Sequence, residues 1–194
     1  MIHIIATSAN VEKDYDVRKD QYLAGLEAIM DHYKIEPHII EVSKQVDYLP
    51  PQYVDSEVYS PNKGNNEFIN IDNFMNKHSE MFHDNDDVIK ITLRYQVISS
   101  YFVDFIKENN QYDAYFKHSS DIYGANDTGV HTFLFCMKYK YWQDFLKNHF
   151  DRNTHKDYPI EAQIAKYLKT LNVKYLDKLD ILASPSNHRK TYKV

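Results

Sequence analysis

The chain has 194 residues, a formal net charge of −5 at pH 7, and 43% hydrophobic and 26% charged residues. This length and composition are typical of one globular domain with its own core. The negative charge argues against a general nucleic-acid-binding protein, because such domains carry a strongly basic surface. The only cysteine, Cys136, cannot form an internal disulfide, which fits a reducing compartment.

The amino terminus and the apolar segments predict where the protein resides. The first stretch, MIHIIATSA, has neither the basic start nor the long apolar region of a signal peptide. No apolar run approaches the roughly 18 residues that a bilayer span needs. We therefore expect a cytoplasmic protein without a membrane span.

Strand-like and amphipathic segments alternate along the chain and predict one mixed α/β domain. Besides a longer central strand, the expected strands cover residues 2–6, 38–42, 57–60, 112–117, 130–138 and 179–183. The expected helices cover residues 17–33, 69–82, 101–109, 141–150 and 160–171. The domain is expected to span residues 1–183, followed by a basic tail, residues 184–194, that is mobile or acts as a lid.

The central strand lies in DNDDVIKITLRYQVIS, residues 84–99. Side chains alternate along a strand, which predicts a core face of Ile89, Ile91, Leu93, Tyr95 and Val97 and an opposite face of Val88, Lys90, Thr92, Arg94 and Gln96. On that opposite face Lys90 and Arg94 would project side by side and suit a phosphate or carboxylate. An antiparallel strand with one solvated face would give the same pattern without a ligand.

Other cations and acids could join this pair. Arg18 lies in the first turn of a helix, where it opposes the helix dipole, so it either serves a ligand or is simply solvated. Lys63 and Gly64 precede the next helix, and such a turn either offers N–H groups and charge to an anion or is a plain loop. With Glu161 and Asp121 as lone acids in later segments, this set suits an enzyme that binds a diphosphate leaving group without a metal.

Metal-binding patterns are weak. The ten histidines lack the spacing of a zinc site. Asp84 and Asp86 form a D-x-D that Mg²⁺ or Mn²⁺ would accept, but they precede the central strand rather than follow it. An acidic surface turn is the favoured interpretation. Dinucleotide, Walker and G-x-S-x-G motifs are absent.

Three short motifs together resemble a known group of enzymes. They are R-x-x-Q-Y (Arg18, Gln21, Tyr22), K-G-x-N-E (Lys63, Gly64, Asn66, Glu67) and I-K-I-T-x-R-Y (residues 89–95). Over roughly residues 1–135 the chain is similar to small GT-A-like glycosyltransferases of bacterial polysaccharide loci and large DNA viruses. The resemblance implies a single three-layer α/β/α domain with a mostly parallel mixed sheet. Leu93 departs from it, because the relatives carry glycine there.

The resemblance also implies roles for particular residues. A sugar would move from a nucleotide-sugar donor to a glycan acceptor, with Glu161 as base and Arg94 stabilising the diphosphate. The implied donor-binding residues are Thr7, Arg18, Lys63, Gly64, Asn66, Glu67, Lys90, Thr92 and Tyr95. No cofactor is required in this interpretation, and a Mn²⁺- or Mg²⁺-dependent enzyme using Asp84 and Asp86 is the weaker alternative. A non-catalytic nucleotide- or carbohydrate-binding protein and a structural protein without a small ligand remain open.

Overall fold

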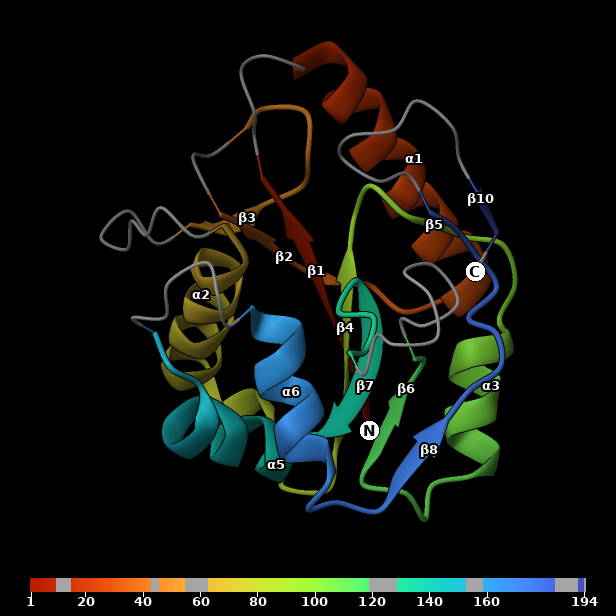
Figure 1. Ribbon diagram of the computed structural model, residues 1–194. Coiled ribbons are helices and arrows are strands. Elements are labelled where there is room, and N and C mark those ends of the chain that lie inside the picture. Colours follow the sequence, from red (N-terminus) through yellow and green to blue (C-terminus); the bar gives the residue numbers. More distant parts are fainter. Residues whose placement is uncertain are drawn as a thin grey trace.

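The computed structural model describes residues 1–9, 15–42, 46–54, 63–118, 129–152, 159–183 and 192–193. Its centre is a seven-stranded sheet in the order β3-β2-β1-β4-β7-β6-β8 (Figure 1). The strands are β1 Ile2–Ser8, β2 His38–Glu41, β3 Gln52–Val54, β4 Asp87–Thr92, β6 Ala114–Phe116, β7 Leu134–Lys138 and β8 Val173–Tyr175. Only β7 runs antiparallel to its neighbours, β4 and β6, so the sheet is mixed and mostly parallel as predicted.

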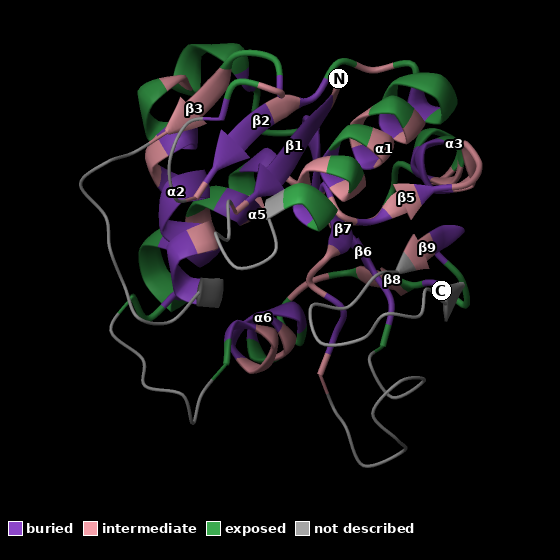
Figure 2. Ribbon diagram, turned by 90° about the horizontal axis from the view of Figure 1, so that it is seen from above, coloured by how far each residue is buried: buried purple, intermediate pink, exposed green. Residues whose placement is uncertain are grey.

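Helices cover both faces of this sheet (Figure 2). On one face lie α1 Tyr15–Tyr33 and α3 Tyr101–Glu108, and on the other lie α2 Lys63–Lys77, α5 Tyr139–Asp144 and α6 Ile160–Leu168. Short segments follow two of them, the 3₁₀ helix η2 Ser79–Met81 and the π-helical η3 Phe145–His149. Ile4 contributes to the core under α1 and Ile5 to the core under α2, as strand alternation requires. The three-layer α/β/α prediction is confirmed.

The central strand differs from its prediction. It ends at Thr92, the backbone turns over residues 93–95, and the chain continues into β5 Gln96–Val97. Gly25 of α1 accounts for the position of this turn, because a Cβ there would lie 1.7 Å from the Leu93 carbonyl oxygen. The core face is nevertheless correct, since Ile89, Ile91, Leu93, Tyr95 and Val97 all join the core beneath α1. A strand with one solvated face is excluded, because helices cover both sides.

A second, small sheet packs beside α1. It has the order β10-β9-β5, with β9 Ile181–Ala183 and β10 Tyr192–Lys193 both in antiparallel pairing. Residues 192–193 of the expected basic tail pair with β9, and a mobile or lid-like tail stays a prediction. Residues 184–191 and 194 lie outside the described part of the chain.

Several smaller elements also differ from expectation. β3 forms in a segment for which neither a strand nor a helix was predicted, and the strand expected at residues 57–60 lies outside the described residues. β8 was not predicted, because a three-residue strand at the edge of the sheet has little pattern. α2 begins at Lys63 rather than at residue 69, so Lys63 and Gly64 form its first turn instead of a preceding turn. The helices expected near residues 17, 101 and 160 are confirmed.

Candidate functional site

Polar side chains gather where β1 and β4 end. β2 lies on one side of β1 and β4 on the other, so the chain moves to one side of β1 through β2 and β3 and then crosses to β4 on the other side. In open α/β sheets a crevice forms at the carboxyl ends of the strands at such a switch point and binds ligands. Strand register sets Thr7 beside Thr92 and Ser8 beside Glu41 at this edge.

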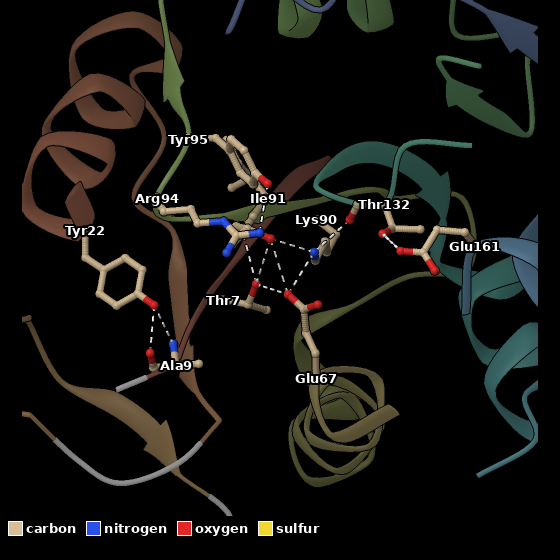
Figure 3. A network of polar contacts seen from close by, with 11 residues as sticks. Thr7, Ala9, Tyr22, Glu67, Lys90, Ile91, Arg94, Tyr95, Thr132 and Glu161 are labelled. Atoms are coloured by element: carbon tan, nitrogen blue, oxygen red, sulfur yellow. Dashed lines mark hydrogen bonds and ion pairs between the residues drawn. The ribbon is translucent and has the colours of Figure 1, made fainter. Parts of the chain in front are cut away.

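Glu67 of α2 is the centre of the polar contacts at this edge (Figure 3). Its Oε1 lies 2.8 Å from Lys90 Nζ and accepts hydrogen bonds from the hydroxyls of Thr92, at 3.4 Å, and Thr7. Thr7 also contacts the Ile91 carbonyl oxygen at 3.4 Å. We call Thr7, Glu67, Lys90 and Thr92 the Glu67 cluster.

Lys90 is held entirely within the protein. Its side chain is 1% exposed, and an ammonium group has three N–H donors. These reach Glu67 at 2.8 Å, Thr92 Oγ1 at 2.9 Å and the Thr132 carbonyl oxygen at 2.7 Å. All three donors of Lys90 are therefore used within the protein, and its role as a cation for a ligand stays a prediction. Lys90 also positions Glu67.

The environment of Glu67 keeps its carboxyl group charged. Burial raises the pKa of Glu67, but the charge of Lys90 and the hydrogen bonds from Lys90 and Thr7 outweigh it and hold the pKa below its usual value. These contacts all go to Oε1. Oε2 makes no hydrogen bond to a described residue, and the side chain is 20% exposed. Glu67 can therefore accept a hydrogen bond from a bound hydroxyl.

Arg94 borders this cluster, and a second arginine, Arg18, lies in α1. The Arg94 guanidinium lies over the Tyr95 ring, 4.9 Å from its centroid, and donates to the Tyr95 hydroxyl at 2.9 Å. Arg94 Nε is buried without a hydrogen-bond partner in the described structure. Arg18, in the first turn of α1, is only 8% exposed. Tyr22, one turn later, fixes α1 to the end of β1 by exchanging hydrogen bonds with the backbone of Ala9 at 2.8 and 3.1 Å.

Glu161 lies next to the Glu67 cluster, in the first turn of α6. It accepts a hydrogen bond from Thr132 Oγ1 at 3.1 Å, and the carbonyl of the same threonine binds Lys90. Asn66 of α2 is buried, and its carbonyl accepts a hydrogen bond from Asn70. The side chain of Lys63 and the whole of Asp121 lie outside the described part of the structure, and Gly64 contributes only backbone to the first turn of α2.

The acidic pair Asp84 and Asp86 is not part of this site. Asp86 lies at the amino-terminal ends of β1 and β4, opposite the Glu67 cluster. There it binds the terminal amine at 2.6 Å, the His83 N–H at 2.8 Å and His3 at 3.3 Å. Asp84 is exposed. Within the described ranges no three carboxylate, histidine or cysteine side chains gather as metal ligands. In the described structure the side chains around Asp84 and Asp86 therefore do not fit a divalent cation held by the protein.

The sequence analysis missed one polar pair at the site edge. Glu41 is fully buried at the end of β2, and it accepts a hydrogen bond from Ser8 at 2.7 Å. An acidic residue at the end of the short strand HIIE is the signal that would have found it, because buried carboxylates need a partner.

Comparisons with known proteins agree with this architecture. No protein-family model and no curated protein sequence matches the chain. Among solved structures, a Bacillus anthracis protein assigned as a glucose-1-phosphate thymidylyltransferase, in complex with sucrose, superimposes with a TM-score of 0.58 and 10% identity over 94% of this chain and 89% of that one. The glycosyltransferase GlyE of Streptococcus pneumoniae gives 0.55 and 10% over 90% and 44%. The galactosyltransferase LgtC, with donor and acceptor sugar analogues, gives 0.50 and 12% over 90% and 73%. At these identities the similarity establishes the fold, which is GT-A-like.

Proposed function

We propose that this protein is a glycosyltransferase that moves a sugar from a nucleotide-sugar donor to a glycan acceptor. The observation that carries the proposal is the Glu67 cluster at the ends of β1 and β4, with one carboxylate oxygen left for a ligand. The similarity to solved glycosyltransferases and to a protein assigned as a sugar nucleotidyltransferase supports it. A role in polysaccharide synthesis and a cytoplasmic location stay predictions from the sequence.

The proposed reaction assigns one step to each side chain. The bond from the anomeric carbon to the diphosphate oxygen breaks, its electron pair stays on the diphosphate, and Arg94 stabilises that charge. The acceptor hydroxyl oxygen forms the new bond to the anomeric carbon, and Glu161 takes its proton. Glu67, fixed by Lys90 and Thr7, accepts a hydrogen bond from a donor hydroxyl and orients the donor.

Metal independence forms part of the proposal. Arg94 lies in the turn that follows β4. The last residue of β4 is Thr92, and this end of the strand carries no carboxylate. The weaker alternative has Asp84 and Asp86 holding Mn²⁺. These residues precede β4, so the metal would lie at the ends of the strands opposite the Glu67 cluster. Transfer that continues in excess chelator would support the metal-independent enzyme.

A panel of nucleotide sugars and glycan acceptors, each with and without Mn²⁺, tests the activity. Glu161→Gln should abolish transfer and leave donor affinity within about twofold, since its carboxylate acts on the acceptor. Glu67→Gln should weaken donor binding as well. The control is Glu80→Gln, which removes an exposed carboxylate of η2.

The panel also separates the alternatives. Saturable donor binding without any transfer would favour a non-catalytic nucleotide- or carbohydrate-binding protein on the same fold. Reactions containing a sugar 1-phosphate and nucleoside triphosphates detect nucleotidyl transfer, the activity named for one similar structure. Equal transfer by Glu161→Gln and the unmodified protein would exclude Glu161 as the base.

A further inference from the structure

A pair of exposed aromatic rings lies at the carboxyl ends of β6 and β8. The rings of His118 and Tyr175 stack with their centroids 4.0 Å apart and an interplanar angle of 11°. His118 is exposed, and Tyr175 is 38% exposed although it belongs to a strand of the main sheet. Two stacked rings in contact with water form a surface that a ligand with an apolar face can cover.

This pair lies at the same edge of the sheet as the Glu67 cluster. β7 runs antiparallel to both β4 and β6, so β6 is parallel to β4, and β8 is parallel to β6. The arrows of β1, β4, β6 and β8 accordingly point the same way in Figure 1. His118 follows the end of β6 by two residues, and Tyr175 is the last residue of β8. Both rings therefore lie at the carboxyl ends of strands, where open α/β sheets bind ligands.

The pair also lies on the same face of the sheet as the two carboxylates of the site. Tyr175 is in register with Phe116 and follows Val173 by two residues, so it shares their face. Phe116 and Val173 pack in the core beneath α2, α5 and α6. Of these helices, α2 carries Glu67 and α6 carries Glu161. The aromatic pair and both carboxylates thus line one side of the carboxyl edge.

A short stretch of backbone connects the pair to Glu161. Val130 forms an antiparallel bridge with His118, and Thr132, two residues later, donates a hydrogen bond to Glu161 at 3.1 Å. Neighbouring strands lie about 4.8 Å apart, so β8 is on the order of 10 Å from β7, the strand that Thr132 precedes. This span exceeds one sugar ring and suits a chain of linked rings.

The backbone beneath the rings is fixed. The Leu176 N–H donates to the Phe116 carbonyl oxygen at 2.7 Å, and Lys117 Nζ donates to the Asp177 carbonyl oxygen. Leu176 and Lys117 are both buried. A tyrosine ring has few rotatable bonds to immobilise, and Tyr175 is already held against a neighbouring ring. Binding on this surface therefore costs little conformational entropy.

A sugar ring suits this surface better than the other parts of the two substrates. A pyranose has C–H groups on its faces and hydroxyls around its rim, and the negative face of an aromatic ring attracts such C–H groups. A diphosphate has no apolar face. The donor base is flat, but the donor is proposed to bind at the ends of β1 and β4, and two strands separate β4 from β8.

We propose that His118 and Tyr175 form a platform for the acceptor glycan, on which a sugar ring beyond the reacting one stacks. The inference rests on the proposed function, and it adds that the acceptor is an oligosaccharide rather than a single sugar. The reacting hydroxyl lies at Glu161, and the platform holds the next part of the glycan on the order of 10 Å away. Oligosaccharide binding can be measured without any donor.

Saturation-transfer NMR titrations in the absence of donor test the platform. The probes are oligosaccharides of glucose, galactose, mannose and N-acetylglucosamine, each series running from the single sugar to the tetrasaccharide. We expect at least one oligosaccharide to bind more tightly than its single sugar, with saturation transferred mainly to the C–H protons of one ring. Tyr175→Ala should weaken this binding at least about threefold, as expected for the loss of an aromatic contact.

Matched variants separate stacking from a structural effect. Tyr175→Phe keeps the ring and should bind as the unmodified protein does, so equal losses in both Tyr175 variants would contradict stacking. His118→Ala removes the supporting ring, should also weaken binding at least about threefold, and decides the question if Tyr175→Ala does not fold. The control is His149→Ala. It removes a histidine ring 4.7 Å from that of Tyr167, at the other end of α6 from Glu161, and should leave oligosaccharide binding unchanged.

The transfer reaction gives a kinetic readout. Tyr175→Ala should raise the KM for an oligosaccharide acceptor at least about threefold and change kcat less, because the platform holds the substrate and the transition state alike. A structural defect of the site would lower kcat and donor affinity together.

The possible outcomes are distinct. The proposal is wrong if no oligosaccharide binds, if single sugars bind as tightly as oligosaccharides, or if folded Tyr175→Ala and His118→Ala both bind within about threefold of the unmodified protein. Lower affinity for UDP or ADP in Tyr175→Ala, with unchanged oligosaccharide binding, would assign the ring to the donor base and also contradict it. Oligosaccharide binding that depends on Tyr175, without transfer from any donor, would support the platform and contradict the proposed function. Transfer to single sugars and oligosaccharides with equal KM would do the reverse.

Discussion

The buried ion pair of Lys90 and Glu67 permits a demanding test of the site. Lys90→Met keeps the length and apolar stem of the side chain but removes its charge. Glu67 then loses a partner at 2.8 Å, and the Thr132 carbonyl loses a donor at 2.7 Å. Removing one partner of a buried pair costs about 3–5 kcal/mol. We expect about 3 kcal/mol, because the 20% exposed Glu67 side chain can regain some hydration.

A double-mutant cycle isolates the interaction between the two side chains. Glu67→Gln keeps an oxygen acceptor but leaves the ammonium without a counter-charge, so a loss of about 2 kcal/mol is expected. The double variant Glu67→Gln/Lys90→Met contains no buried charge. It should therefore be less destabilised than the sum of the two single variants by about 2 kcal/mol. Urea denaturation gives each free energy of unfolding.

The pH dependence of stability supplies an independent check. The pKa of Glu67 is lowered in the folded protein, so its contribution to stability is present above the unfolded value of about 4.3 and is lost as pH falls through the folded pKa. Without Lys90 we expect burial, the largest single contribution, to outweigh the remaining effects of Thr7 and Arg94 and to raise the folded pKa of Glu67. The sign then reverses, and its contribution is greatest below about pH 4.3 and declines as pH rises through the folded pKa.

A matched control and a refuting result complete this test. Lys178→Met removes a lysine paired with Asp180 at a similar distance, 3.0 Å, but the Lys178 side chain is 53% exposed, so a loss of at most about 1 kcal/mol is expected. If Lys90→Met also costs less than about 1 kcal/mol and its pH profile parallels that of the unmodified protein, the buried pair does not stabilise Glu67 as reasoned.

Three other substitutions test the fold around the site. Gly25→Ala places a Cβ 1.7 Å from the Leu93 carbonyl oxygen, so urea denaturation should show a loss of at least about 2 kcal/mol despite the better helix propensity, and unchanged stability would contradict the close packing. Burial raises the pKa of Asp86, but the terminal amine, His83 and His3 together lower it by more, so the folded pKa lies below its usual value. The stabilisation by Asp86 is therefore lost as pH falls through the folded pKa. Asp86→Asn should cost about 1–2 kcal/mol at pH 7, and this cost should shrink as pH falls through the folded pKa of Asp86. Trp142→Phe loses a 3.1 Å hydrogen bond to the Val88 carbonyl and leaves a cavity, for which thermal unfolding should report about 2–3 kcal/mol.

Local patterns predicted the layers of the fold but not where the central strand ends. Ile89, Ile91 and Leu93 were placed on the correct core face because alternation depends only on neighbouring residues. The turn after Thr92 depends on α1, since the close approach at Gly25 meets the Leu93 carbonyl. A contact between residues so distant in the sequence leaves no trace in the pattern of either segment.

Part of the site was also visible in the sequence. Thr7, Glu67, Lys90 and Glu161 do lie together, and strand ends are where such residues meet in an α/β domain. Their pairing was not predicted. Glu67 approaches Lys90 only because α2 starts at Lys63 and turns Glu67 toward the ends of β1 and β4. An ion pair between a helix and a strand depends on that rotation, which composition and spacing do not specify.

The ion pairs also decide which cations remain for a ligand. An ammonium in mid-sheet, like that of Lys90, cannot stay buried without a counter-charge, so its position on β4 already required a carboxylate. Arg18 and Arg94 lie at the edge of the sheet, where a ligand can supply the counter-charge. Within the described structure neither arginine forms an ion pair with a carboxylate, which disfavours the free protein and favours the bound one, because part of the desolvation cost is incurred before the anion arrives. The same arrangement that lowers stability therefore raises affinity, and the two effects should change in opposite directions when either arginine is replaced.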